Sequence, residues 1–299
     1  IMPRRTPQPD RARSPEGFAI TDYQKFIFDL KGWLVIPSVL DAGDIERIRA
    51  YLLRLRDGAS SIPEHERNTW AGPCQDLLDH PVLVDALREL IGEDLGADHR
   101  PTVDTAPPAE SAAYAFRCDN SFHMIKAADE ARPRGAHNGG PAMGPTHNYQ
   151  WVAGRMFSPS VRAVWELNAV PATGGGTVFI SGSHKANYLM PPDDQLDDAR
   201  FESYACPAGS LILFSENTCH GSATWTDPAQ PRIAVFNHYT HYTMRFHVDV
   251  PDARLIDAMP PLRRTLFRDV WTYHFGGRPP HPNNYDAPDN RAHSPRYPR

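Results

Sequence analysis

The stretch Gly209-Ser-Leu-Ile-Leu-Phe-Ser-Glu-Asn-Thr-Cys-His-Gly-Ser222 sets an apolar run, a turn and a histidine in a row. The apolar run is short and bounded by turn residues, so it predicts a buried strand, 210–215, that delivers His220 just beyond its end. Arg232 follows twelve residues after His220, at the start of a second apolar run, 232–239. Imidazole is a common iron ligand, and a guanidinium can pair with both oxygens of a carboxylate. The pattern therefore predicts iron and 2-oxoglutarate side by side.

The composition is that of a globular chain without a strong charge bias. Its 299 residues carry 31 basic and 36 acidic side chains, for a formal net charge of −5, and these charges are spread along the sequence. A chain of this length can bury a substantial core. No block of charge favours nucleic acid or an anionic membrane, so we expect a small-molecule substrate as the partner. The composition leaves the oligomeric state open.

Cysteine usage and hydropathy bear on the compartment. The four cysteines are far apart and form no Cys-x-x-Cys pair, which is typical of unbridged thiols in a reducing compartment and disfavours a zinc knuckle; they are Cys74, Cys118, Cys206 and Cys219. No apolar stretch of 18 residues occurs. We therefore expect a cytoplasmic protein.

The chain divides into a proline-rich arm (1–20), one folded domain (21–275) and a tail rich in Pro, Asn, Asp and Arg (276–299). Residues 23–30 predict a short helix and residues 32–37 a strand that ends at a proline. Two further helices are expected to pack on a sheet. One is capped by Asp41 and has a stripe of Ile45, Ile48, Leu52 and Leu55, and the other begins near Pro81 and has a stripe of Leu83, Leu87, Leu90 and Ile91.

The second half of the domain reads as short strands joined by glycine turns. Residues 161–170 alternate between an apolar face that includes Trp165 and a more polar face that includes Arg162 and Glu166. A triple-glycine turn, 174–176, leads into the apolar run 177–180. With the two runs described above, this spacing predicts a mainly β fold with some α: a double-stranded β-helix, the cupin-like jelly roll, with an N-terminal helical layer.

A non-haem Fe(II) site needs two histidines and usually one carboxylate, with positions left for 2-oxoglutarate and O2. His220 is the candidate distal histidine. For the proximal ligand we favour His137, in the glycine-rich loop 135–140, over His147, ten residues further on. Neither histidine is followed two residues later by an acidic residue.

The third iron ligand is therefore open. Glu216, four residues before His220, is the candidate carboxylate, although it also fits a solvated turn or a partner that orients His220. The alternative is an open halide site at Gly139, two residues after His137. Arg232 is the candidate anchor of the 2-oxoglutarate carboxylate and Ser222 its hydroxyl partner, and we expect the substrate pocket to include Arg117, Asp119 and His123.

At these residues the chain resembles the phytanoyl-CoA dioxygenase family of Fe(II)/2-oxoglutarate oxygenases, from about Tyr23 to Tyr239. The resemblance rests on three segments, of which the middle one is the most specific because it contains an aromatic-Ile-x-Gly-Ser-His-Lys string in order. The segments are Phe26–Pro37, Trp165–Lys185 and Gly209–Arg232.

The resemblance implies a jelly roll whose iron is held by a His-x-Asp pair and a distal histidine. Carried over residue by residue, it implies iron bound by His137 and His220, and 2-oxoglutarate bound by Arg232 and Ser222. It also implies cosubstrate contacts for Asn138 and Trp165. The missing aspartate is a departure. Family halogenases replace this acid with Gly or Ala, whereas the branch that this chain resembles keeps a glutamate before the distal histidine, so Glu216 stays the candidate third ligand.

We therefore expect a non-haem Fe(II)/2-oxoglutarate-dependent dioxygenase that uses O2 to oxidise a C–H bond of a small molecule, most simply by hydroxylation, and that releases succinate. No catalytic residue is assigned beyond the metal ligands. The alternatives are a 2-oxoglutarate-dependent halogenase, a jelly-roll binding protein with a degenerate metal site, and a cupin-like isomerase or hydrolase that uses a metal without 2-oxoglutarate.

Overall fold

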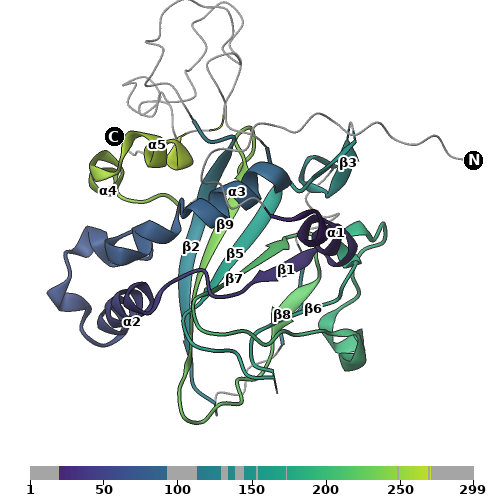
Figure 1. Cartoon of the computed structure of the whole chain (residues 1–299), viewed down its shortest axis with the longest axis horizontal. Coiled ribbons are helices and arrows are strands. Elements are labelled where there is room, and N and C mark those ends of the chain that lie inside the picture. The colour runs from purple at the N-terminus through teal and green to yellow at the C-terminus, as the bar shows by residue number, and fades with distance from the viewer. Residues whose placement is uncertain are drawn as a thin grey trace, which may run out of the picture.

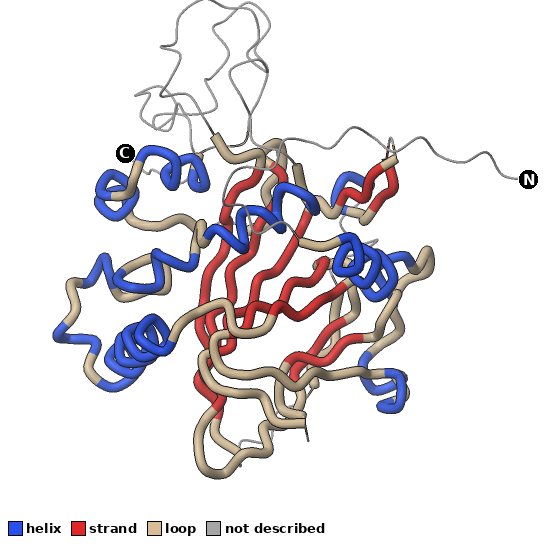
Figure 2. Tube along the Cα trace, in the orientation of Figure 1, coloured by secondary structure: helices blue, strands red, loops and turns tan. Residues whose placement is uncertain are grey.

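The computed structural model describes residues 20–92, 113–128, 134–138, 145–152, 154–172, 174–247, 249–268 and 270. The expected tail 276–299 and most of the expected arm 1–20 lie outside these ranges. Ile20 is the exception, because it is buried in the core and so belongs to the folded part. Strands occupy the centre of the molecule and helices surround them (Figure 2).

The largest element is a five-stranded antiparallel sheet with the strand order β1-β7-β5-β9-β2 (Figure 1). Strands next to each other in this sheet are far apart in the sequence, so residues from both halves of the chain share one surface. In spatial order the strands are β1 (Trp33–Ile36), β7 (Ser210–Ser215), β5 (Ser160–Glu166), β9 (Arg232–His241) and β2 (Phe116–Lys126).

A smaller antiparallel sheet pairs β6 (Thr177–Phe179) with β8 (His220–Ser222). Single bridges extend it on both sides, from His137 to His220 and from Glu202 to Phe179. Strands β3 (Gln150–Val152) and β4 (Arg155–Phe157) form a separate hairpin.

The α-helices precede β2 or follow β9 in the chain. Asp41 caps α2 by accepting a hydrogen bond from the Asp44 N–H, as predicted, and a Thr21–Gln24 capping box begins α1. The helices are α1 (Asp22–Lys31), α2 (Ala42–Asp57), α3 (Pro81–Leu90), α4 (Ala253–Ala258) and α5 (Pro261–Arg264). Short 3-10 helices are η1 (Ala59–Ser61), η2 (Glu64–Glu66), η3 (Gly72–Leu77), η6 (Pro145–His147), η7 (Ser183–Lys185), η8 (Asp193–Gln195), η9 (Asp198–Arg200) and η10 (Thr265–Phe267).

The two faces of the large sheet bury different clusters. Alternate residues of β5, including Ala163 and Trp165, share a core cluster with the buried faces of α2 and α3. The other face of β5, including Val164, packs with aromatic residues of the small sheet such as Phe179. The alternation expected for this strand is therefore confirmed. The strand ends at Glu166 rather than at residue 170, because Val170 pairs with Cys206 outside the sheet.

Gly32 sits where α1 turns into β1 and touches the turn that precedes His220. Its φ of +84° is left-handed, and a Cβ built there would lie 2.3 Å from Thr218 Oγ1 and 2.5 Å from His184 Nδ1. Thr218 in turn donates a hydrogen bond from Oγ1 to the Gly32 carbonyl (3.0 Å). The first helix, the first strand and the turn before His220 are thus in direct contact.

Gly32→Ala should destabilise the fold by roughly 2–4 kcal/mol, because left-handed strain and the clash with Thr218 add together. Gly154→Ala is the matched control, since Gly154 has a φ of +82° but no atom within 4 Å of the added Cβ. The control should lose only about 1–2 kcal/mol, from the backbone strain alone. Urea unfolding measures both variants, and equal losses would contradict the contact described here.

Candidate metal centre

His137 and His220 lie next to each other across an antiparallel bridge. The His137 N–H donates to the His220 carbonyl and the His220 N–H donates to the His137 carbonyl, both at 2.9 Å. Their ring centroids are 4.3 Å apart. The backbone therefore brings together two imidazoles that are distant in the sequence.

Each of these rings is held by its own local backbone. Nδ1 of His137 donates to the Gly135 carbonyl (2.7 Å), and Nδ1 of His220 donates to the Thr218 carbonyl (2.8 Å). A carbonyl can only accept, so the proton of each neutral ring is on Nδ1 and the lone pair is on Nε2. Metal-binding histidines are commonly oriented by such a bond. Both side chains thus present a metal-binding nitrogen.

Glu216 approaches His220 from the turn after β7. Its Oε2 lies 3.9 Å from Nε2 of His220, while its Oε1 accepts a 2.6 Å hydrogen bond from Nε of Arg162. Arg162 also donates from Nη1 to Oδ1 of Asn120 (2.8 Å). One carboxylate oxygen is therefore fixed by the guanidinium and the other faces the distal histidine. The solvated-turn interpretation of Glu216 is wrong, because this side chain is only 7 % exposed.

The charges at this centre suit a divalent cation. Burial lowers the pKa of His220 to about 4, and His137 adds to the decrease while Glu216 opposes it, so the ring is neutral at neutral pH. Burial would raise the pKa of Glu216, but the charges of Arg162, His238 and His220 outweigh it and hold the pKa below its usual range. Two imidazoles and one carboxylate are the ligand set of a non-haem Fe(II) site.

Arg232 lies at the predicted place but with an unpredicted partner. Its Nε contacts both carboxylate oxygens of Glu166 at 3.2 Å, and its Nη2 contacts Glu166, Thr177 Oγ1 and the Tyr204 hydroxyl. Nη1 donates to the sulfur of Met124 (3.8 Å). The expected pairing of the guanidinium with both oxygens of 2-oxoglutarate does not fit this geometry, because Glu166 already occupies two of the three nitrogens.

Lys126 is a cation that the sequence analysis did not identify. It lies opposite Arg232 in the register of β2 and β9, and its Nζ donates to Ser222 Oγ (3.4 Å) and to the Ala223 carbonyl (2.8 Å). Ser222 in turn pairs with Thr177 across β6 and β8. A buried lysine, a buried arginine and a hydroxyl thus share one end of the space between the two sheets. Strand alternation could have placed Lys126 on the same face as Asn120, Phe122 and Met124. It could not have predicted Ser222 as the partner of Lys126.

Trp165 does not lie on this side of the sheet. Its side chain is fully buried in the helix-side core, with its ring centroid 5.4 Å from that of His80. The residues of β5 that face the metal centre are Arg162, Val164 and Glu166. The prediction that Trp165 lies beside the cosubstrate is inconsistent with this strand alternation, since successive side chains point to opposite faces.

The remaining site predictions have mixed outcomes. Asn138 lies beside the metal centre, where its Nδ2 donates to the Asn217 carbonyl (3.4 Å). His147 contacts the ring of Phe246, with centroids 6.3 Å apart, and the structure therefore places His137, not His147, beside the distal histidine. Gly139, the predicted halide position, lies outside the described residues.

Of the three predicted pocket residues, only Asp119 joins a polar cluster on the side of the metal centre. Arg117 is buried and donates to the carbonyls of Arg268 (2.6 Å) and Met244 (3.2 Å). His123 lies opposite Val235 in the register of β2 and β9, on the face of the sheet that the helices cover.

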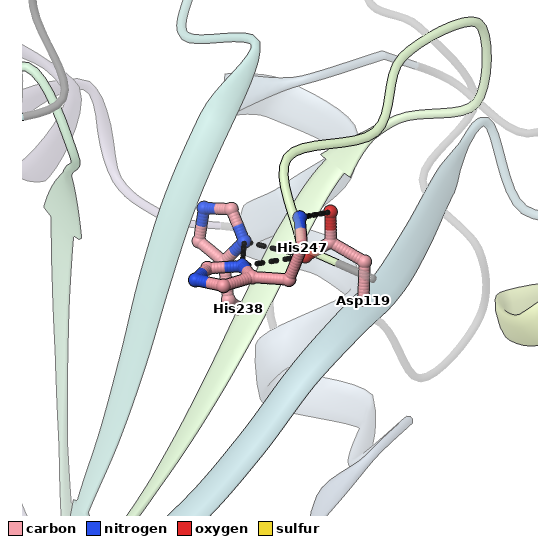
Figure 3. Close-up of side chains that lie close together, drawn as sticks. All are labelled: Asp119, His238 and His247. Atoms are coloured by element: carbon pink, nitrogen blue, oxygen red, sulfur yellow. Dashed lines mark hydrogen bonds and ion pairs between the residues drawn. The ribbon is translucent and has the colours of Figure 1, made fainter. Parts of the chain in front are cut away.

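The carboxylate of Asp119 forms hydrogen bonds with two histidines, His238 and His247 (Figure 3). Its Oδ1 lies 2.5 Å from Nδ1 of His238 and 3.4 Å from Nδ1 of His247, and its Oδ2 accepts the backbone N–H groups of Phe246 (2.7 Å) and His247 (3.2 Å). Nε2 of His238 lies 2.7 Å from Ser160 Oγ. Burial raises the pKa of Asp119, but His238 and these hydrogen bonds hold it well below its usual range.

Comparisons with known proteins concern the family and the fold. The family described as phytanoyl-CoA dioxygenase (PhyH) matches residues 28–234. HygX from Streptomyces hygroscopicus, solved with nickel and 2-oxoglutarate, superposes with a TM-score of 0.58 at 20% identity, covering 79% of this chain and 94% of HygX. The non-haem monooxygenase ThoJ in its nickel complex gives 0.51 at 14% identity, covering 73% and 77%.

A third structure, the non-haem α-ketoglutarate-dependent epimerase SnoN from nogalamycin biosynthesis, gives a TM-score of 0.50 at 17% identity, covering 79% of this chain and 86% of SnoN. At these identities the likeness concerns the fold. No curated protein matches the chain by sequence.

Glu216→Gln should weaken Mn(II) binding about 10–100-fold, because the substitution removes the ionised oxygen that faces His220 and keeps the shape. Glu202→Gln is the control: Glu202 is a carboxylate of the small sheet that pairs with Lys31 (2.7 Å). Its Mn(II) affinity should match that of the wild type. Titration followed by electron paramagnetic resonance measures both, and an unchanged affinity of Glu216→Gln would show that this carboxylate is not a ligand.

Proposed function

This chain belongs to the phytanoyl-CoA dioxygenase family, and on that premise we propose that it is an Fe(II)/2-oxoglutarate-dependent oxygenase acting on a small molecule. The reaction that we propose is hydroxylation of a C–H bond. We also propose that the two antiparallel sheets are the walls of a jelly roll and that the helices before β2 cover its larger sheet. HygX, solved with nickel and 2-oxoglutarate, is consistent with that fold.

One observation carries the proposal. His137 and His220 are held ring against ring by reciprocal backbone hydrogen bonds, and both turn Nε2 away from the carbonyl that fixes Nδ1. Glu216 adds a buried, ionised carboxylate 3.9 Å from one of those nitrogens. We propose these three residues as a 2-His-1-carboxylate ligand set. Their ligand atoms do not all lie within 4.8 Å of one another, so a side chain would move to bind one ion.

The residues around the ligands have separable tasks. Iron and 2-oxoglutarate, when bound, would use O2 to oxidise the substrate C–H bond: one oxygen atom would go to the hydroxylated product and the other to succinate, with release of carbon dioxide. Arg162 holds one oxygen of Glu216 and leaves the other for the metal. The aromatic residues of the inner cluster, including Phe179 and Phe214, exclude water from the space beside the metal.

We place the distal carboxylate of 2-oxoglutarate at the end of the inner space where Lys126, Ser222 and Arg232 meet. The lysine ammonium and the serine hydroxyl face each other there, and Nη1 of Arg232 has the thioether of Met124 as a neighbour at a long 3.8 Å, a weaker partner than a carboxylate would be. Glu166 holds the arginine in place through its other two nitrogens. The arginine then acts mainly as a fixed charge, and the lysine and serine donate the closer hydrogen bonds.

Glu216 favours oxidation over halogenation. A halogenase needs an open position on the metal, whereas the carboxylate here is buried, ionised and already aimed at His220. A binding protein with a degenerate site would have no need for two histidines with fixed tautomers.

Anaerobic addition of Fe(II) and 2-oxoglutarate should produce a weak visible charge-transfer band, and oxygen should then yield succinate. A protein that forms neither the band nor succinate is not an oxygenase.

Lys126→Met should weaken 2-oxoglutarate binding by about tenfold or more, the cost of a charge-assisted hydrogen bond, and change Mn(II) affinity little. Lys185→Met is the control, because Lys185 pairs with Asp29 (2.9 Å) at the surface. Isothermal titration of 2-oxoglutarate into the Mn(II)-loaded proteins gives both affinities. Equal 2-oxoglutarate affinity in the two variants would move the distal carboxylate elsewhere.

A further inference from the structure

A second group of metal-binding side chains lies apart from the His137–His220 pair. We propose that Asp119, His238 and His247 form a second divalent transition-metal site of the zinc class. Their ligand atoms all lie within 4.8 Å of one another, and the described part of the chain has no other group of three His, Cys, Asp or Glu residues that meets this spacing. The three side chains converge on one point in Figure 3.

The separations of the ligand atoms are close to those around an ion. Zn(II) bound at about 2.0–2.1 Å holds its ligands roughly 3.0–3.4 Å apart. Nδ1 of His238 and Nδ1 of His247 are 3.2 Å apart, and Asp119 Oδ1 is 3.4 Å from Nδ1 of His247. Asp119 Oδ1 and Nδ1 of His238 are 2.5 Å apart, which is a hydrogen bond. An ion replaces that proton, and this one pair opens by about half an ångström.

The supporting hydrogen bonds are already in place. The second carboxylate oxygen of Asp119 accepts two backbone N–H groups, from Phe246 and His247. His238 has Ser160 Oγ at 2.7 Å from Nε2, so its proton can reside on Nε2 and be donated to the hydroxyl when Nδ1 binds metal. Metal-binding histidines and carboxylates are typically oriented in this way.

One register shift in β2 and the course of the chain after β9 bring the three residues together. A shift in register between Cys118 and Asn120 of β2 lets Asp119 point to the same face as Asn120, opposite His238 of β9. His247 comes from the segment after β9. The side chains of Asp119 and His238 are 0 % exposed and that of His247 is 24 % exposed. Among these three ligands, His247 is therefore the one that solvent reaches.

The second site adjoins the first but does not share ligands with it. Glu216 stands between them, with Oε1 3.9 Å from Nε2 of His238 and Oε2 3.9 Å from Nε2 of His220. Two imidazoles and one carboxylate, without thiolate, suit zinc and neighbouring first-row divalent ions. The ion would tie the segment after β9 to the sheet that carries the first centre.

Zn(II) content of the full-length protein tests the proposal. Metal-free protein is equilibrated with excess Zn(II), desalted and analysed by inductively coupled plasma mass spectrometry. We expect two equivalents in the wild type, one in His247→Ala, one in His220→Ala and none in the double variant. His123→Ala, a histidine on the other face of β2, should keep two. His247→Ala is preferred to changes at the two fully buried ligands because its side chain is partly exposed.

The outcomes separate this inference from the proposed function. If the wild type binds one equivalent of Zn(II), and this equivalent is lost in His220→Ala but kept in His247→Ala, the second site does not exist. If the one equivalent is instead lost in His247→Ala and kept in His220→Ala, the second site is supported and the proposed iron centre is contradicted. Should His247→Ala unfold, Co(II) titration of His220→Ala decides: visible d–d bands that saturate at one equivalent support the second site, and no bands reject it.

Discussion

The antiparallel bridge between His137 and His220 is the constraint on which the candidate metal centre depends. Its two 2.9 Å hydrogen bonds involve only backbone groups, so they fix the separation of the two rings before any ion is considered. A carbonyl two residues upstream of each histidine then sets the ring orientation. The metal-binding nitrogens are thus preorganised by main-chain geometry, which lowers the entropic cost of assembling the ligands.

The interior charges around this bridge are satisfied in pairs. Arg162 pairs with Glu216, Arg232 pairs with Glu166, and Asp119 is bonded to His238. A buried charge without a partner is costly, so each pair restricts the positions that its members can adopt. Glu216 consequently directs Oε2 toward His220, and Arg232 directs Nη1 toward Met124.

The large sheet separates structural packing from chemistry by strand alternation. One face of β5, including Trp165, is buried under the helices, and the other, including Arg162 and Glu166, faces the small sheet. A one-residue shift in β2 breaks this rule and adds Asp119 to the inner face. Mutations on the helix-side face should therefore act through stability, and those on the inner face through binding.

The sequence alone was sufficient for local features: the cap and stripe of α2, the strands β7 and β9, the family, and the histidine and arginine at the strand ends. These depend on patterns of a few neighbouring residues. Only the tertiary structure showed that His137, and not His147, lies beside His220 and that Arg232 pairs with Glu166. It also showed that Lys126 contacts Ser222 and that Trp165 packs on the opposite face of the sheet, against His80. Those outcomes depend on which strands become neighbours and in what register, and a single sequence does not specify long-range pairing.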